Sequence, residues 1–413
     1  MSDEIPEPTT GAPIIVGGDG SLIVPDEPIV CFIEGDGAGP ELWAATRRVL
    51  DAAVARAYGP ARRIVWREVL AGAKAHARLG SWLPPRALTQ LQHHVLAIKG
   101  PLETPEGAGF RSLSVAIRQM LDLYAAVRPI RWLRGVPSPV RHPEAVDVIL
   151  FQENTEGVHA GLEWPAGSDE VEALIAFLRD ELGVVTLRFP QTTALGLKPV
   201  SEEGSHRLVA AAIQHALDHD LPSVTLVHQG DTMQHTEGAF ASWGLALAEQ
   251  RFGDRVFTAL QHARIAGSQG LQAAERAQQQ ARDQRRVLIH SVPTDAMLQQ
   301  ILTRPGEHPV IAALSLSGGH LAGALAAQVG GPGIAPVANI NYTNGVSVYE
   351  AGHGTVPRHA GSDKVNPSAL SLSGAMMLRR MGWDEASDLV VHGIERAISD
   401  KQVTHDLHRW MEG

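Results

Sequence analysis

The segment Ile33-Glu34-Gly35-Asp36-Gly37-Ala38-Gly39-Pro40 decides the fold, because it joins two elements of different kinds. Residues 28–34, which lead into it, form a short apolar run rich in residues that favour strands. After it, apolar residues recur with a helical period at Leu42, Ala45, Val49 and Ala53. A strand, a glycine-rich turn and a helix in this order predict an α/β fold.

The glycine-rich turn has two interpretations that the local sequence does not separate. Glycines ahead of a helix can cradle a phosphate at the helix N-terminus. They can also simply permit a tight turn, because glycine tolerates backbone angles that other residues avoid. No βαβ unit with an acidic residue for a ribose follows, so a Rossmann fold is the weaker interpretation.

The bulk properties exclude several classes of protein. The 413 residues exceed one ordinary domain, and a hydrophobic content of 44% is typical of a globular chain. The net charge of −10 argues against broad nucleic-acid binding. The single cysteine, Cys31, excludes an internal disulfide and fits a reducing compartment. Residues 1–13 lack a signal-peptide pattern, and no apolar run approaches the roughly 18 residues of a membrane helix. We therefore expect a cytoplasmic protein without nucleic-acid or membrane partners.

Three further segments have a recognisable character. Residues 1–25 are predicted to be a flexible tail, since residues 1–13 are acidic and rich in Pro and Thr. Residues 262–286 are rich in Gln, Ala and Arg with few large apolar side chains, which predicts an exposed helix. Val185, Leu187 and Phe189 alternate with polar residues, which predicts an exposed strand edge that needs a partner.

Further motifs follow the glycine-rich turn in a fixed order. They are Lys99-Gly100-Pro101-Leu102-Glu103-Thr104-Pro105, Asp122-Leu123-Tyr124, Glu153-Asn154-Thr155-Glu156, Gln328-Val329-Gly330-Gly331, His353-Gly354-Thr355 and Asp363-Lys364-Val365-Asn366-Pro367. With the turn, they resemble the NADP-dependent isocitrate dehydrogenases, which are metal-dependent β-decarboxylating dehydrogenases. The resemblance covers roughly residues 28–412.

This resemblance implies an isocitrate/isopropylmalate dehydrogenase-like α/β fold with a large domain, a small domain and a clasp, not a Rossmann fold. The large, cofactor-binding domain would comprise residues 26–123 and 331–413, and the small domain residues 124–160 and 201–330. Residues 161–200 would form a clasp shared between two subunits. We therefore expect a homodimer whose active site lies between the domains and is completed by the partner subunit.

The resemblance also implies a pocket for a small anionic substrate. Ser112, Arg118 and Arg128 stand where the family contacts substrate carboxylates. Ser112 is also predicted to cap a helix over residues 113–121, and a guanidinium offers paired donors to a carboxylate. The alternative is a plain helix cap with ordinary surface arginines.

Three other pocket positions depart from the family pattern. A third arginine is replaced by Gln152, the proton-transferring lysine by Gln229 and the proton-transferring tyrosine by His159. Gln152 and Gln229 remain candidate substrate contacts, although an amide cannot titrate. His159 can titrate near neutrality and is the candidate catalytic residue. It can equally be a residue that only fills the volume of the tyrosine.

The metal positions depart as well. Two aspartates of the family are Gly319 and Gly323 here, and only Asp295 matches a metal ligand. Mg²⁺ and Mn²⁺ prefer several hard oxygen ligands, so the sequence predicts no metal site.

The cofactor segment is better preserved, and we expect NADP. The predicted cofactor-binding residues are Thr104, His353, Gly354, Arg358, His359, Asn366, His405 and Arg409, with Arg304 supplied by the partner. Their arginines and histidines can donate hydrogen bonds to a 2′-phosphate. The alternative is that these basic residues lie on the surface by coincidence and bind no phosphate. The loop Asn339–Asn344 is about two residues longer than the family pattern, so we expect the nicotinamide end to be reshaped.

Three hypotheses for function follow. The sequence favours an NADP(H)-binding protein repurposed for metal-independent chemistry on an anion with fewer carboxylates than isocitrate. The second hypothesis is a catalytically inactive NADP(H)-binding regulatory homologue. The third is a genuine NADP-dependent isocitrate dehydrogenase.

Overall fold

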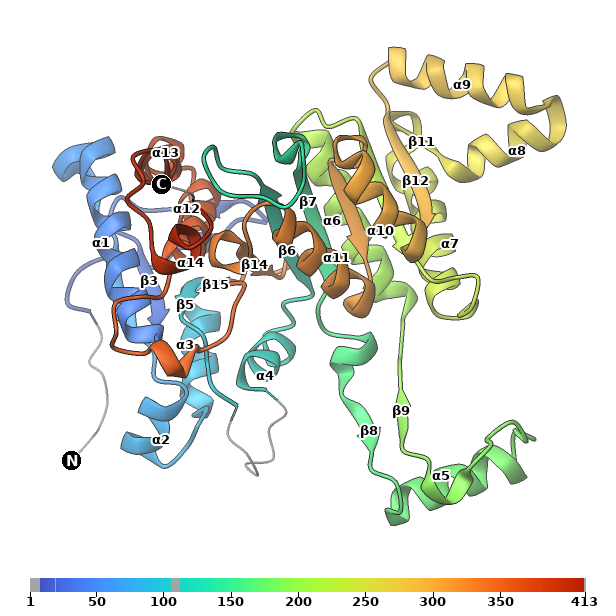
Figure 1. The fold of residues 1–413 in the computed structure, drawn as a ribbon, viewed down its shortest axis with the longest axis horizontal. Coiled ribbons are helices and arrows are strands. Elements are labelled where there is room, and N and C mark those ends of the chain that lie inside the picture. The colour runs from blue at the N-terminus through green and yellow to red at the C-terminus, as the bar shows by residue number, and fades with distance from the viewer. Residues whose placement is uncertain (1–7, 19, 105–111, 412–413) are drawn as a thin grey trace.

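The computed structural model describes residues 8–18, 20–104 and 112–411, which surround one long mixed sheet (Figure 1). Its eleven strands lie in the order β11 (Val256–Thr258), β12 (Val287–Pro293), β10 (Ser223–His228), β13 (Val310–Ala313), β7 (Asp147–Glu153), β6 (Ala125–Arg131), β14 (Pro336–Ile340), β15 (Ser347–Ala351), β5 (Leu96–Lys99), β3 (Ile29–Ile33) and β4 (Val65–Glu68).

The strands run in parallel within each half of this sheet. At one end β15, β5, β3 and β4 are parallel, and at the other end β7, β13, β10, β12 and β11 are parallel. Antiparallel pairing through β6 and β14 joins the halves, so their strands point in opposite directions. Strands β3, β5, β11, β13, β14 and β15 are buried along their whole length, as expected for strands covered on both faces.

Helices cover the two halves of the sheet. The half at the β4 end carries α1 (Gly39–Tyr58), α2 (Ala73–Leu79), α3 (Pro85–His94), α4 (Leu113–Met120), α12 (Ser368–Arg380), α13 (Asp384–Ser399) and α14 (His405–His408) (Figure 1). The other half carries α6 (Glu202–Asp218), α7 (Glu237–Leu247), α10 (Thr294–Thr303) and α11 (Ser315–Gln328) (Figure 1). The α/β class is therefore as predicted. None of the helices in the described ranges is long and apolar enough to cross a membrane.

The glycine-rich turn between β3 and α1 is packed by protein backbone. A Cβ on Gly37 would lie 2.4 Å from the Thr355 carbonyl oxygen, and one on Gly35 would lie 2.5 Å from the Pro101 oxygen. Both glycines also have positive φ. Asp36 accepts hydrogen bonds from the N–H groups of Ala73 and Glu103, at 2.9 Å each. These contacts favour the tight-turn interpretation over a phosphate cradle.

The N-terminal segment differs from the predicted tail. Strands β1 (Ile15–Val16) and β2 (Leu22–Ile23) form a hairpin, and Ile14 is buried in the main core. Ala12 pairs with Pro28, which ties the segment to the edge of the fold. An apolar pattern too short to predict a strand is thus stabilised by tertiary packing. Residues 1–7 of the predicted tail lie outside the described residues.

The predicted exposed helix over 262–286 is instead two helices. They are α8 (Ala259–Gln269) and α9 (Leu271–Asp283), which form a hairpin beside β11 and β12 (Figure 1). Gly270 between them has a φ of 86°, an angle that glycine adopts easily. A Thr258–Gln261 capping box fixes the start of α8.

Residues 161–200 project from the body as an arm (Figure 1). The arm contains β8 (Leu162–Trp164), α5 (Asp169–Asp180) and β9 (Leu195–Leu197), and β8 pairs with β9. The predicted strand over Val185–Phe189 is not a strand, but Val185 and Phe189 are 84% and 61% exposed. The exposed apolar side chains that motivated the prediction are therefore present on an irregular segment.

Candidate functional site

The candidate site is built on a row of residues that crosses four neighbouring strands. Lys99 of β5 pairs with Glu350 of β15, and Glu350 pairs with Val337 of β14. Arg128 of β6 follows Val127, which pairs with Ala338, so Arg128 lies beside Val337. Residues directly opposite on neighbouring strands share one face of a sheet. Together with Arg118 of α4, the row lines a cavity of about 140 Å³.

Glu350 is the anion at the centre of this row. Its carboxylate accepts from Lys99 Nζ at 2.5 Å, from the Arg118 guanidinium and from Asn339 Nδ2 at 2.8 Å. Burial opposes ionisation, but the two cations hold the pKa of Glu350 well below its usual value. The site therefore contains a carboxylate that stays charged.

Arg128 is a cation without a carboxylate partner in the described part of the chain. Its Nε donates to Gln152 Oε1 at 3.1 Å, and Gln152 Nε2 donates to the Ser315 carbonyl oxygen at 2.7 Å. Burial and the neighbouring Arg118 lower the pKa of Arg128 to about 10. With Lys99 and Arg118 against one Glu350, the row has an excess of two positive charges. Such a site favours an anionic ligand.

The helix cap at Ser112 is confirmed. Ser112 Oγ accepts from the Val115 N–H at 3.4 Å, and α4 begins at Leu113. The cap orients α4 so that Arg118, in its last turn, reaches Glu350. Arg118 is therefore a half-buried member of the site and not an ordinary surface arginine.

His159 lies beside the two arginines. It belongs to the short helix η3 (Gly157–Ala160), and its carbonyl oxygen accepts from Gln119 Nε2 of α4 at 2.7 Å. Burial and the charges of Arg118 and Arg128 lower its pKa to about 4. Its Nδ1 is buried and has no hydrogen-bond partner among the residues described. The imidazole is thus neutral near pH 7 and can accept a proton or a hydrogen bond, but it does not titrate in the ordinary histidine range.

Gln229 and the family's metal positions lie at the carboxyl edge of the other half of the sheet. Gln229 follows β10, Asp295 follows β12, and α11 follows β13. The Gln229 N–H donates to buried Glu237, which also pairs with Lys198. No side-chain partner is found for the Gln229 amide in the described ranges.

A divalent metal does not fit the residues found at these positions. Asp295 is exposed, and its Oδ1 accepts from the neighbouring Ala296 N–H at 2.8 Å. Gly323 faces open space, and a Cβ on Gly319 would meet Gln152 Nε2 at 3.6 Å. The part of the chain that the structure describes contains no group of three or more His, Cys, Asp or Glu residues suited to a metal ion.

Several residues predicted for the cofactor are exposed at the surface. Gly354 faces open space, and Arg358 and His359 are exposed on the short helix η9 (Pro357–His359) that follows it. Asn366 Nδ2 donates to Asp406 Oδ2 at 3.0 Å, which ties the predicted adenosine segment to α14. His405 and Arg409 flank Asp406 and are exposed. These exposed side chains can donate to a nucleotide phosphate, and their role in cofactor binding stays a prediction.

Three other expectations at the cofactor end receive no support from the structure. Thr104 is exposed and borders residues that are not described. Arg304 pairs with Glu307 at 3.4 Å at the end of α10, so a role toward a second subunit stays a prediction. The segment Asn339–Asn344, predicted to be longer than the family pattern, covers the end of β14 and part of the turn before β15. This turn does not adjoin His353, because it lies at the opposite end of β15 and packs on the β1–β2 hairpin. The expected reshaping of the nicotinamide end has no support from its position.

The sequence reasoning missed the roles of Lys99 and Glu350. Both are charged residues within otherwise apolar strands, and both are almost fully buried. A buried charge is rarely tolerated without a partner. That pattern was a usable signal, although only the strand order shows that the two residues pair.

Comparisons with known proteins agree along almost the whole chain. The family profile described as isocitrate/isopropylmalate dehydrogenase matches residues 29–412. A Staphylococcus epidermidis protein named isocitrate dehydrogenase (NADP) is 52% identical over 392 residues, which cover 95% of this chain and 93% of that protein. A Pseudomonas aeruginosa protein of the same name is 49% identical over 412 residues, which cover 99% of this chain and 95% of that protein. The crystal structure of isocitrate dehydrogenase from Methylococcus capsulatus superposes with a TM-score of 0.71 at 27% identity, covering 92% of this chain and 94% of that one.

These comparisons correct the favoured hypothesis of the sequence analysis. A protein repurposed for metal-independent chemistry was inferred from replacements at residues 152, 159, 229, 319 and 323. That inference is contradicted by relatives that share about half of all residues over nearly the full length and carry one common name. The predicted isocitrate/isopropylmalate dehydrogenase-like fold is confirmed.

Proposed function

The chain belongs to the isocitrate/isopropylmalate dehydrogenase family, and on this basis we propose that it is an NADP-dependent isocitrate dehydrogenase. The observation that carries the proposal is the identity of about 50% over nearly the whole length with proteins of that name. The cationic row supports it independently, because an excess of positive charge suits a substrate with several carboxylates.

The substrate would bind against the sheet row. Arg118 and Arg128 would each offer guanidinium donors to a carboxylate, and Ser112 would stand at the helix start nearby. Gln152 would act by holding Arg128, since both of its amide atoms are already hydrogen-bonded. Glu350 and Lys99 would keep Arg118 in place.

His159 would be the proton-accepting group. Its neutral imidazole lies beside the two arginines, and its buried Nδ1 has no partner among the described residues, so it can accept from a substrate hydroxyl. A bound anion would offset the repulsion from the arginines and raise its basicity. Bound NADP⁺ would supply the hydride acceptor, held by Arg358, His359, Asn366, His405 and Arg409.

We also propose that the site is divergent within its family. The residues present do not fit a divalent metal, so we derive no step through one. Gln229 cannot transfer a proton, and general acid–base groups contribute factors of about 10²–10⁴ to a rate. Turnover should therefore be slower than that of the Staphylococcus and Pseudomonas relatives.

The decisive experiment is an assay of NADPH formation from isocitrate, with and without Mg²⁺ or Mn²⁺, beside a relative as a positive control. We expect slow NADPH formation with NADP⁺ and less with NAD⁺. His159→Phe should lower turnover without changing NADP⁺ affinity. If wild-type protein forms no NADPH at any metal concentration at which the relative is active, the proposal fails.

We further propose a cytoplasmic homodimer that pairs through the arm at residues 161–200. Exposed Val185 and Phe189 favour burial against a second copy. Sedimentation at micromolar concentration should give the mass of a dimer, and deletion of the arm should give a monomer. A stable full-length monomer would refute this assembly.

A further inference from the structure

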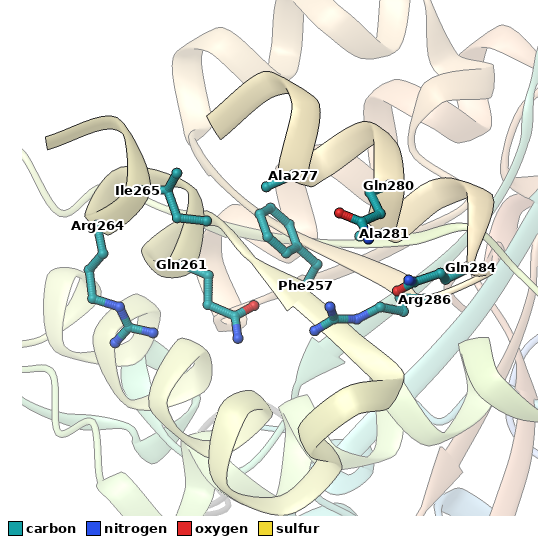
Figure 2. A pocket seen from close by; sticks show the side chains of 9 residues that line it. All are labelled: Phe257, Gln261, Arg264, Ile265, Ala277, Gln280, Ala281, Gln284 and Arg286. Carbon is teal, nitrogen blue, oxygen red and sulfur yellow. The ribbon is translucent and has the colours of Figure 1, made fainter. Parts of the chain in front are cut away.

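A second pocket lies far from the sheet row, under the α8–α9 hairpin. It has a volume of about 370 Å³, within the range of about 300–1,000 Å³ typical of small-molecule sites. Figure 2 shows the Phe257 ring at its floor, with Arg264 and Arg286 approaching from opposite sides. Ala277 and Ala281 line the α9 side and pack with Phe257 in one apolar cluster, against which Ile265 also packs.

The polar groups of this pocket are two arginines and three glutamines. Arg264 pairs with Glu249 at 2.7 Å. Arg286 donates to the Val256 carbonyl oxygen and lies 5.7 Å from the centroid of the Phe257 ring, but it has no acidic partner among the described residues, so one positive charge stays uncompensated locally. Gln261 uses its oxygen in the helix cap, and its Nε2 has no partner among the described residues. Gln280 and Gln284 have no side-chain hydrogen bonds within the described residues. No acidic residue lines the pocket.

The surrounding segment has a charge opposite to that of the whole chain. Residues 251–286 contain seven arginines, no lysine and three acidic residues, a formal excess of four positive charges, whereas the chain carries −10. A local positive field in an acidic protein concentrates small anions at that place. The walls formed by the partly exposed Ile265 and Ala277 also suit a compact apolar body.

From these observations we propose that the pocket under the α8–α9 hairpin binds a small organic monoanion, namely a carboxylate with a compact apolar body. The carboxylate would bind between Arg264 and Arg286, with the apolar body against Ile265 and Ala277. The single uncompensated positive charge in this pocket favours a monoanion, whereas the sheet row suits a ligand with several negative charges. This site is independent of the proposed dehydrogenase activity.

Fluorine NMR titration of full-length protein with fluorobenzoate tests the proposal, with fluorobenzylamine as a cationic probe of similar shape. We expect saturable binding of fluorobenzoate only. Ala277→Phe should fill the pocket and abolish binding, while Ala273→Phe, one turn away on α9, should not. Arg264→Gln should weaken binding roughly tenfold or more, and Arg276→Gln, which removes an arginine outside the pocket, should leave it nearly unchanged.

Circular dichroism would establish that each variant is folded. If Ala277→Phe does not fold, the binding measured with Arg264→Gln decides whether the proposal holds. Absence of saturable binding to wild-type protein would overturn the proposal. So would full binding to folded Ala277→Phe, because the carboxylate would then lie elsewhere, for example at Arg118 and Arg128. Equal binding of both probes would show that charge does not select the ligand, which would equally overturn it.

Discussion

Glu350→Gln should be among the most destabilising single substitutions at the site. The Lys99 side chain is 2% exposed and that of Glu350 is 6% exposed, so neither charge is screened by solvent. Removing the anion leaves Lys99 buried without a counterion and Arg118 without its partner. Breaking a buried ion pair from one side costs about 3–5 kcal/mol, and we expect a loss of that size in the free energy of unfolding.

Urea unfolding followed by circular dichroism would measure this loss. Glu27→Gln is the matched control, because it removes an exposed carboxylate paired with Arg63 and should leave the free energy of unfolding almost unchanged. Citrate should raise the melting temperature of Glu350→Gln more than that of wild type, since an anion can replace the lost charge. A loss no larger than that of the control would refute the buried-pair reasoning.

The pair of Lys99 and Glu350 should also make the free energy of unfolding depend on pH. The pKa of Glu350 in the folded protein is below its ordinary value of 4.5, so the unfolded chain binds the proton first on acidification. The stabilisation is complete above that ordinary value and is lost as the pH falls toward the lower folded-state pKa. Glu350→Gln should therefore be destabilised relative to wild type at neutral pH, with the difference narrowing in acid.

Three further substitutions test other parts of the site. The pKa of His159 is about 4 in the folded protein against an ordinary value of 6.5, so on acidification the unfolded chain takes up the proton first. The stability of the folded protein should therefore fall as the pH drops from 6.5 to 4, and His159→Gln should flatten that fall in a series of melting temperatures. An unchanged slope in the variant would contradict the lowered pKa of His159. Gly319→Asp with Gly323→Asp should fold, because both positions have room, and should raise the affinity for Mn²⁺ in an EPR titration; unaltered affinity would show that the helix start is misplaced for a metal. Arg358→Ala with Arg409→Ala should weaken NADP⁺ binding by calorimetry while leaving NAD⁺ binding nearly unchanged, and equal weakening of both would argue against a 2′-phosphate site.

Local patterns in the sequence predicted local structure well. The cap at Ser112 was predictable because a cap depends on one side chain and the next three residues. The division of 262–286 into two helices was less accessible, because Gly270 inside a helical pattern is often tolerated. The β1–β2 hairpin was inaccessible, since such short strands are stabilised only by the core that Ile14 joins.

The candidate site was predicted at the level of residue types but not of pairings. Arg118 and Arg128 were singled out together as substrate contacts, yet one pairs with Glu350 and the other with Gln152. The difference arises from strand order, which places β15 and β7 on opposite sides of the β6–β14 pair. Spacing along the chain contains no information about that order.

Gln152 shows why a replaced residue is not an isolated loss. Its Oε1 holds Arg128 on β6, and its Nε2 holds the Ser315 carbonyl oxygen at the start of α11. A Cβ on Gly318 would lie 2.6 Å from Gln152 Cγ, so the Gln152 side chain on β7 leaves no room for a side chain at position 318 of α11. The position of Arg128 is therefore coupled to the start of the helix that carries Gly319 and Gly323. Substitutions on either side of this contact should change substrate binding and the geometry of α11 together, and their effects should not add.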